Sequence, residues 1–132
     1  FISVKKDRKG QIKELNEKLF QTLEFKQIKF VIFVEHTVDV NDIKDTMWRF
    51  ANNFDPKRDS FLTEKGIGMD GTRKTKEHDN FDRPWPNIIC ANESTIKSID
   101  EKWSTLGLGE FIESPSIKYR KMLYKGGAVA EE

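Results

Sequence analysis

The sequence predicts an α/β fold in which helices cover both faces of a parallel sheet. The first observation is the segment 28–34, which is apolar throughout except for Lys29. A strand with one face in water would alternate, so this pattern is typical of a central parallel strand. The second is the order strand, helix, strand, helix, strand over residues 1–63, which implies right-handed crossovers. Together they predict a three-layer, Rossmann-like unit, followed by a long irregular segment and C-terminal helices.

Composition restricts the class of protein. Of the 132 residues, 36% are hydrophobic and 34% charged, which predicts one globular domain over residues 1–127 and a frayed tail over residues 128–132. The net charge of +1 removes the electrostatic argument for a nucleic-acid partner. No apolar run in the sequence approaches the roughly 20 residues of a membrane span. The single cysteine, Cys90, excludes an internal disulfide and favours a reducing, cytoplasmic location.

The first elements are a strand and an amphipathic helix. Residues 1–4 are rich in β-formers and lack an initiator methionine, so we expect a first strand within a fragment cut from a longer polypeptide. The alternative is an N-terminus with a few further residues before Phe1. The helix is predicted to begin at Gln11. Its apolar residues recur at spacings of three, four and four, whereas lysines and glutamates occupy the other faces. The predicted buried stripe consists of Ile12, Leu15, Leu19 and Leu23.

The segment after the central strand predicts a second helix. Asn41 is the predicted N-cap, and acidic residues follow it at the positive end of the helix. Pro56 disfavours helical geometry at the residue before it, so this helix is predicted to end near Asn53. Residues 58–63 are the predicted next strand of the parallel sheet. The predicted buried stripe of the helix consists of Ile43, Met47, Phe50, Ala51 and Phe54.

The remainder of the chain is predicted to be irregular and then helical. Residues 64–87 contain glycines, prolines and charges without a sustained period, which predicts a long irregular segment. A short strand is predicted over residues 88–90. Two helices follow, the second with a proline in its first turn. The predicted cap and stop of the first are Asn92 and Gly107, and the predicted start and end of the second are Ser114-Pro115 and Gly126-Gly127.

One motif suggests a nucleotide site. Residues 66–71, GIGMDG, match the dinucleotide fingerprint G-x-G-x-x-G. That fingerprint requires a buried strand before the glycines and a helix after them, whose N-terminus holds the pyrophosphate. Residues 72–76, TRKTK, are a poor start to a packed helix. The nucleotide hypothesis therefore depends on a helix that opens at Gly71 or Thr72.

A histidine and a polar cluster are further candidate site residues. His36 follows the central strand at its carboxyl end, where open α/β sheets bind ligands. No second metal ligand can be placed beside it, so a solvated histidine is the alternative. Asp70, Arg73 and Lys74 are polar groups among glycines that can bind an anion or grip a neighbouring domain. A loop salt bridge is the alternative for this cluster.

Three blocks, in order, resemble the C-terminal domain of UbiD-like decarboxylases, and the resemblance covers residues 29–108. In the first block, VEHTVDVND and WRFANNFDPKRD occupy residues 34–42 and 48–59. In the second, GMDGTRK at residues 68–74 is similar to the family's K-M-G-x-D-A-T-x-K segment, and Trp85-Pro86 follows. In the third, IDEKW at residues 99–103 and LGL at residues 106–108 resemble the family's closing helix.

The resemblance implies the oligomerisation and active-site-closing domain of a non-oxidative carboxy-lyase. Such enzymes decarboxylate aromatic or unsaturated carboxylic acids, quinone precursors among them, with prenylated FMN, a divalent metal (Mn or Mg) and potassium. The flavin, the metal and a Glu-Arg-Glu catalytic set belong to the preceding domains of the same chain. No catalytic, cofactor-binding or metal-binding residue is therefore expected in this fragment, which would be inactive alone and part of a homo-oligomer.

The chain departs from the family pattern near the candidate loop. The acidic V-D-x-D turn is VEHT here and keeps its acidity only at Glu35, and Gly71 stands in place of the family's alanine. Ile67, not lysine, precedes Gly68. A stand-alone α/β ligand-binding or regulatory module is the alternative to the decarboxylase domain. The residues predicted to face the active site or a partner domain are Met69, Asp70, Arg73, Lys74 and His36.

Overall fold

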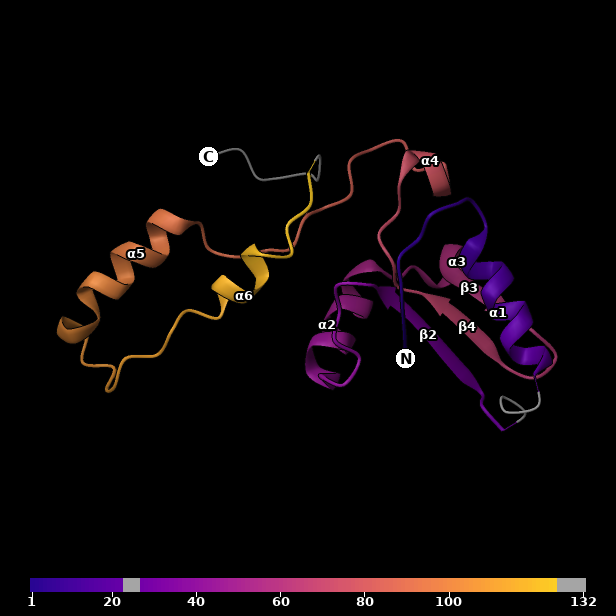
Figure 1. Ribbon diagram of the computed structural model, residues 1–132, viewed down its shortest axis with the longest axis horizontal. Coiled ribbons are helices and arrows are strands. Elements are labelled where there is room, and N and C mark those ends of the chain that lie inside the picture. The colour runs from indigo at the N-terminus through magenta and orange to yellow at the C-terminus, as the bar shows by residue number, and fades with distance from the viewer. Residues whose placement is uncertain (23–26, 126–132) are drawn as a thin grey trace. The chain divides into compact units, whose positions relative to one another are not determined.

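The computed structural model describes residues 1–22 and 27–125, and within it the chain divides into two compact units. The first unit is Phe1–Arg83 and the second begins at Pro84 (Figure 1). The sequence predicts one domain over residues 1–127, whereas the contacts form these two groups. The expected positions of Leu23, the Gly126-Gly127 stop and the tail at 128–132 lie outside the described residues.

The first unit is built on a four-stranded sheet with the strand order β1-β2-β4-β3 (Figure 1). β2 is central, as the sequence predicts, and pairs in parallel with both β1 and β4. β3 pairs with β4 in the antiparallel direction at the edge of the sheet. The strands are β1 (Ile2–Val4), β2 (Phe30–Glu35), β3 (Ser60–Leu62) and β4 (Ile67–Asp70).

The prediction of an entirely parallel sheet, with residues 64–87 irregular, is wrong at the β3–β4 hairpin. The chain reverses between Thr63 and Gly66, where the amide of Thr63 donates to the carbonyl of Gly66 at 2.8 Å. The amide of Gly66 donates to Oγ1 of Thr63 at 3.1 Å, so a short turn joins β3 directly to β4 and makes the two strands antiparallel. The segment 64–87 also contains β4 and a short helix, α4 (Lys76–Asp79).

Helices cover both faces of this sheet. Successive side chains of β2 point to opposite faces, so Val31 and Phe33 pack in one cluster and Val34 in another. The first cluster includes Ile12 and Phe20 from the first helix, and the second includes Phe50 from the second helix. The helices of this unit before α4 are α1 (Gln11–Gln21), α2 (Ile43–Asn53) and α3 (Pro56–Asp59).

The predicted details of α2 are only partly confirmed. The helix ends at Asn53 as expected, but its N-cap is Asp42, whose side chain accepts from the amide of Asp45 at 3.1 Å. Asn41 donates instead to Oδ1 of Asp39. Of the predicted stripe, Phe50 is buried and Phe54 half-buried, whereas three members are exposed. The exposed members are Ile43, Met47 and Ala51, and the residues buried in their place are Asp45, Thr46 and Arg49.

The physical reason for this difference is a hydrogen bond of α2 to the preceding loop, which sets the face that the helix buries. Oγ1 of Thr46, which is fully buried, donates to the carbonyl of Asp39 at 3.1 Å. This bond turns the polar side of the helix toward the loop that precedes it. The periodicity of apolar residues therefore predicted the helix and not the side that it buries.

The second unit contains two helices and a 3₁₀ turn. Asn92 caps α5 as predicted, because its Oδ1 accepts from the amide of Thr95 at 2.8 Å. α5 ends at Lys102 and continues as a 3₁₀ turn, after which Gly107, the predicted stop, takes the left-handed conformation with φ of 65°. The last helix ends at Arg120, earlier than expected, and begins one residue after Pro115. The elements are α5 (Glu93–Lys102), η1 (Trp103–Thr105) and α6 (Ser116–Arg120).

The strand predicted over residues 88–90 does not form. This part of the chain is irregular and is fixed by bonds to the segment that carries α6. Nδ2 of Asn87 donates to the carbonyl of Tyr124 at 2.9 Å, and the amide of Ala91 donates to Oγ of Ser116 at 3.0 Å. A side chain thus takes the amide that a neighbouring strand would have bound.

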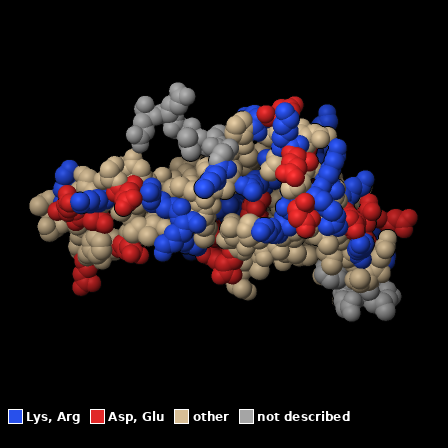
Figure 2. Space-filling view, turned by 45° about the horizontal axis from the view of Figure 1, so that its top comes forward, with Lys and Arg blue, Asp and Glu red and all other residues tan. Residues whose placement is uncertain are grey.

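Two properties of the surface bear on the choice of partner. Figure 2 shows basic and acidic side chains interspersed on the face in view, without a broad surface of one sign. Among the described residues, no helix has both the length and the apolarity that crossing a membrane requires.

Candidate functional site

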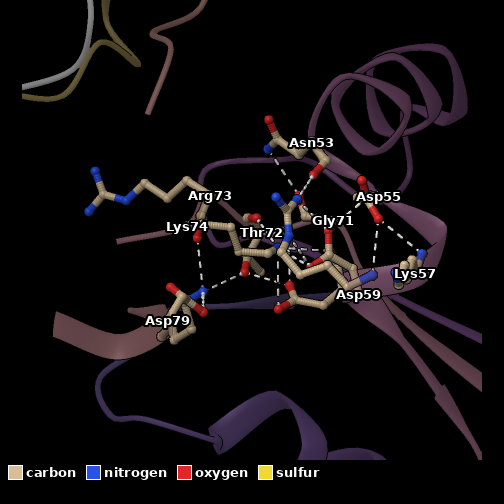
Figure 3. Close-up of polar contacts among 12 residues, drawn as sticks. Asn53, Asp55, Lys57, Asp59, Gly71, Thr72, Arg73, Lys74 and Asp79 are labelled. Carbon is tan, nitrogen blue, oxygen red and sulfur yellow. Dashed lines mark hydrogen bonds and ion pairs between the residues drawn. The ribbon is translucent and has the colours of Figure 1, made fainter. Parts of the chain in front are cut away.

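The candidate site lies at the carboxyl edge of the sheet. β1, β2 and β4 run parallel, so the segments that follow them emerge at the same edge. Charged and hydroxyl side chains from these segments, from α3 and from α4 meet there (Figure 3). We call this group the carboxyl-edge network. Its members are Lys6, Glu35, Asp59, Asp70, Thr72, Lys74 and Asp79.

Lys6 joins the segment after β1 to the loop after β4. Its Nζ donates to Oγ1 of Thr72 at 3.0 Å, to the carbonyl of Arg73 at 2.8 Å and to Oδ1 of Asp79 at 2.7 Å. These three acceptors use the full donor capacity of an ammonium group. The Lys6 side chain is only 6% exposed, so its charge is held inside the network and does not face solvent.

Lys74 occupies the centre of the network and is buried. Its Nζ donates to the carbonyls of Asp70 and Thr72 at 2.9 and 2.7 Å. It also lies 3.4 Å from Oδ2 of Asp70 and 3.5 Å from Oδ1 of Asp59. Burial lowers the pKa of Lys74 from its usual value, while the two carboxylates act in the opposite direction. The buried ammonium is therefore both paired and hydrogen-bonded, as burial of a charge requires.

Asp59 links the network to α3. Its carboxylate accepts two bonds from the guanidinium of Arg58, at 2.8 and 2.7 Å, and one from the amide of Asp55 at 2.9 Å. The bonds that Arg58 donates to Asp59 raise the pKa of Arg58. Asp55 caps α3 in turn, and its bonds from the amides of Arg58 and Lys57 lower the pKa of its carboxyl.

The loop after β4 is thereby fixed at its main chain. The amide of Thr72 donates to Oδ1 of Asp70 at 2.9 Å, and Nδ2 of Asn53 donates to the carbonyl of Gly71 at 3.0 Å. Oε1 of Glu35 accepts from the amide of Arg73 at 2.8 Å. The backbone of residues 71–74 consequently has partners from β2, α2 and its own strand, so the loop is held in one conformation.

Two of the predicted site residues lie at the outer side of the edge. Figure 3 shows the side chain of Arg73 directed away from the network, although its amide is part of it. The side chain of His36 is 46% exposed, and its Nδ1 lies 3.7 Å from Oε2 of Glu35. Glu35 thus contacts both residues, one at the backbone and one at the ring. Of the five predicted residues, these two reach the surface of the edge.

The other three predicted residues make contacts within the domain. Asp70 and Lys74 form the loop salt bridge that the sequence left as an alternative to anion binding. Met69 is half-buried in β4 and packs against the cluster of Val34, Val38 and Phe50. Met69 therefore contributes to the core on this face of the sheet.

The nucleotide hypothesis is wrong. Residues 67–70 of the G-x-G-x-x-G match form strand β4, and no helix opens at Gly71 or Thr72. The glycines serve packing instead. A Cβ at Gly68 would lie 2.0 Å from Oδ1 of Asn16, and one at Gly66 would lie 2.7 Å from the ring of Phe20. Their missing side chains let α1 approach the sheet closely.

Several network residues are not among the predicted site residues. The sequence pattern places Lys6 in a charged turn and Asp59 at the end of the Asp-Pro block. Residues just after parallel strands share one edge of the sheet. This rule could have identified Lys6 as a site residue, because Lys6 closely follows the strand predicted over residues 1–4. Asp79 comes from α4, inside the segment predicted to be irregular, and offers no such signal.

The network does not supply a metal or flavin site. Within residues 1–22 and 27–125, no three His, Cys, Asp or Glu side chains converge in a set that would hold a metal ion. The carboxylates of Asp59, Asp70 and Asp79 are instead neutralised by Lys74 and Lys6. Because these groups satisfy one another, the donor set fits neither a divalent metal nor the phosphate of a flavin.

The fold and the site define a class of protein: an α/β domain with a mixed sheet whose carboxyl edge is closed by its own side chains. The chain belongs to the 3-octaprenyl-4-hydroxybenzoate carboxy-lyase C-terminal domain family, whose model matches residues 1–80. An uncharacterised protein of Aquifex aeolicus is 29% identical over 124 residues, which cover 82% of this chain and 25% of that protein. The chain spans about a quarter of the length of the curated relatives it matches.

Solved structures show the same fold. The chain is similar to the UbiD-class enzyme HmfF of Pelotomaculum thermopropionicum, solved in an evolved dimeric form in complex with prFMN. The TM-score is 0.51 with 26% identity, over 62% of this chain and 18% of that one. It is also similar to the closed form of vanillic acid decarboxylase from Sedimentibacter hydroxybenzoicus. That match has a TM-score of 0.56 and 20% identity, over 80% of this chain and 25% of the other.

Proposed function

We propose that this chain is the C-terminal domain of a UbiD-class non-oxidative decarboxylase, where it supports oligomerisation and closes the active site. The observation that carries the proposal is the family match over residues 1–80, in a chain that spans about a quarter of its relatives. The catalytic groups then belong to preceding domains of the same polypeptide. The self-satisfied carboxyl-edge network supports this division, because a supporting domain needs a fixed edge and not a reactive one.

The finer features follow from the same assignment. The preceding domains hold prenylated FMN, with a divalent metal (Mn or Mg) and potassium, and HmfF in complex with prFMN supports the flavin. The substrate is an aromatic or unsaturated carboxylic acid, and the similarity to a vanillic acid decarboxylase supports the aromatic class. The proposal also includes a cytoplasmic location, a homo-oligomeric enzyme and a three-layer, Rossmann-like arrangement of the first unit.

The closing role concerns the outer side of the carboxyl edge. Vanillic acid decarboxylase has been solved in open and closed forms, which supports a domain that moves relative to the others. In this chain, Arg73 and His36 are the predicted site residues at the surface of the edge, and the network fixes the loop that carries Arg73. We infer that these two side chains face the active site when the domain closes. A guanidinium on a fixed loop is suited to an anionic group such as a carboxylate.

An Arg73→Ala substitution in the full-length enzyme tests this role. The expected result is a loss of about 10- to 100-fold in kcat/KM, the range that one charge-assisted hydrogen bond supplies. The measurement is steady-state decarboxylation, with Lys57→Ala as the control, because Lys57 is exposed and contributes its amide to the cap of α3. An unchanged kcat/KM for Arg73→Ala would show that Arg73 does not face the active site. Flavin binding to the isolated chain tests whether the cofactor belongs to the preceding domains. We expect the isolated chain to bind no flavin.

A further inference from the structure

The hydrogen-bond ladder between β2 and β4 continues past the last residue of β4. At the start of the pair, the amide of Ile67 donates to the carbonyl of Lys29 at 2.9 Å. One residue after β4 ends, the amide of Gly71 donates to the carbonyl of Phe33 at 2.8 Å. Both bonds join residues with the same separation in the sequence, as the constant register of a parallel pair requires. The next amide along this edge is that of Arg73.

At this next step of the ladder, a side chain takes the place of a main-chain carbonyl. In the same register, the amide of Arg73 would donate to the carbonyl of Glu35. That carbonyl has another partner, because the amide of Val38 donates to it at 2.9 Å and closes the turn after β2. Oε1 of Glu35 accepts from the amide of Arg73 instead, at 2.8 Å. Glu35 therefore holds two loops, one with its carbonyl and the other with its carboxylate.

The bond to Arg73 is the main contribution of the Glu35 side chain. The side chain is only 12% exposed, and a hydrogen bond to an ionised acceptor is stronger than one between neutral groups. The second carboxylate oxygen, Oε2, lies 3.7 Å from Nδ1 of His36, whose ring is exposed. An exposed pair of this kind contributes little. The substitution of Glu35 is therefore expected to act on the loop after β4 and less on His36.

We propose that Glu35 is a positioning residue for decarboxylation and that it acts through the main chain of Arg73. The bond to the amide sets the direction in which the guanidinium leaves the loop, and Figure 3 shows that the side chain points away from the network. Gly71 and Thr72 have partners of their own, so the carboxylate controls the position of Arg73 and not the whole loop. The inference rests on the active-site role proposed above for Arg73.

The direction of the guanidinium matters because the substrate class is a carboxylic acid. A guanidinium binds a carboxylate best in one plane, through two parallel hydrogen bonds. A displacement of about 1 Å at such a contact can cost about 100-fold in rate. Lys6 still donates to the carbonyl of Arg73 at 2.8 Å, so loss of the bond to Glu35 loosens the loop without releasing it. The effect of losing Glu35 is therefore smaller than that of losing the guanidinium.

Steady-state decarboxylation by the full-length enzyme tests this role. Glu35→Ala is expected to lower kcat/KM by about 3- to 30-fold, less than Arg73→Ala does, because the guanidinium is displaced and not removed. Glu35→Gln keeps an oxygen that accepts from the amide, so its kcat/KM is expected to stay within about threefold of the original. Equal losses for the two variants would overturn the proposal, since glutamine preserves the acceptor.

Glu77→Ala is the matched control for the loss of a glutamate beside a histidine. Oε1 of Glu77 lies 3.6 Å from Nε2 of His78, much as Glu35 lies beside His36. The side chain of Glu77 is 83% exposed and belongs to α4, outside the loop after β4. This variant is expected to leave kcat/KM unchanged.

A double variant separates positioning from a general structural effect. If Glu35 acts through Arg73, its loss has nothing further to displace once the guanidinium is gone. The kcat/KM of Glu35→Ala combined with Arg73→Ala is therefore expected to match that of Arg73→Ala alone within about twofold. Additive losses would overturn the proposal, because they would mean that Glu35 acts by another route.

Hydrogen exchange in the same enzyme gives a readout apart from activity. Peptides that span residues 71–75 are expected to exchange faster in Glu35→Ala than in Glu35→Gln or the original enzyme, because the amide of Arg73 loses its acceptor. Unchanged exchange would overturn the proposal. An unchanged kcat/KM for Glu35→Ala beside a loss for Arg73→Ala would overturn the positioning role alone. An unchanged kcat/KM for Arg73→Ala would overturn the closing role as well.

Discussion

An Asp59→Ala substitution is expected to lower the free energy of unfolding by about 3–5 kcal/mol, the cost of leaving a buried ion pair without one partner. Asp59 is 1% exposed and accepts bonds from the guanidinium of Arg58 and the amide of Asp55. Its carboxylate also lies 3.5 Å from the ammonium of Lys74, which is buried as well. The alanine would therefore remove one of the carboxylates that compensate the buried charge of Lys74.

Urea denaturation of the isolated chain measures this loss. Asp59→Asn keeps the shape of the side chain and removes the charge, so it is expected to lose less and remains measurable if the alanine variant does not fold. The matched control is Asp82→Ala, because Asp82 is exposed and its loss is expected to stay within about 0.5 kcal/mol. A loss below about 1 kcal/mol for Asp59→Ala, the range of an exposed ion pair, would show that the network does not hold the edge together.

The second large effect is expected at Gly68, where an alanine would overpack the contact between α1 and β4. Its Cβ would lie 2.0 Å from Oδ1 and 2.4 Å from Cγ of Asn16. Asn16 is fully buried, and its Nδ2 donates to the carbonyl of Phe61 at 3.3 Å, so the amide cannot swing away without losing that bond. The expected loss of unfolding free energy is about 1–3 kcal/mol.

A double-mutant cycle separates this contact from a general effect of alanine in a strand. Asn16→Ala removes the group that the new methyl would meet, so Gly68→Ala is expected to cost less in the Asn16→Ala background than in the original chain. Denaturation midpoints of the four proteins give the coupling. Additive losses, with no coupling between the two sites, would mean that Asn16 does not require the glycine.

Gly66 and Gly68 also explain why one parallel strand could be predicted from the sequence and its neighbour could not. β2 was predictable because nearly every residue of it is apolar, and the outcome is the central strand with parallel neighbours on both sides. β4 was not predictable because Gly66 and Gly68 remove the apolar period at its start. The reason for those glycines lies with Asn16 and Phe20 in α1, far away in the sequence, and is visible only once the helix rests on the sheet.

The candidate site was predictable in location and not in composition. The rule for parallel strands placed His36 at the carboxyl edge, and the polar residues near Gly71 were recognisable as a group. Which of them turn inward depends on Lys6, which is 66 residues from Thr72 and 73 from Asp79. Such long-range pairs leave no mark in a local pattern. The buried face of α2 was unpredictable for a similar reason, because the bond from Thr46 to Asp39 sets that face.

We propose that the chemistry of the full-length protein resides in domains that precede this chain, and flavin titration of the isolated chain tests this proposal most directly. Prenylated FMN would be titrated into the 132-residue chain with Mn²⁺ and K⁺ present and followed by flavin fluorescence, with the full-length enzyme as the positive control. We expect no saturable binding to the isolated chain and stoichiometric binding to the full-length enzyme. Tight, stoichiometric flavin binding by the isolated chain would contradict it.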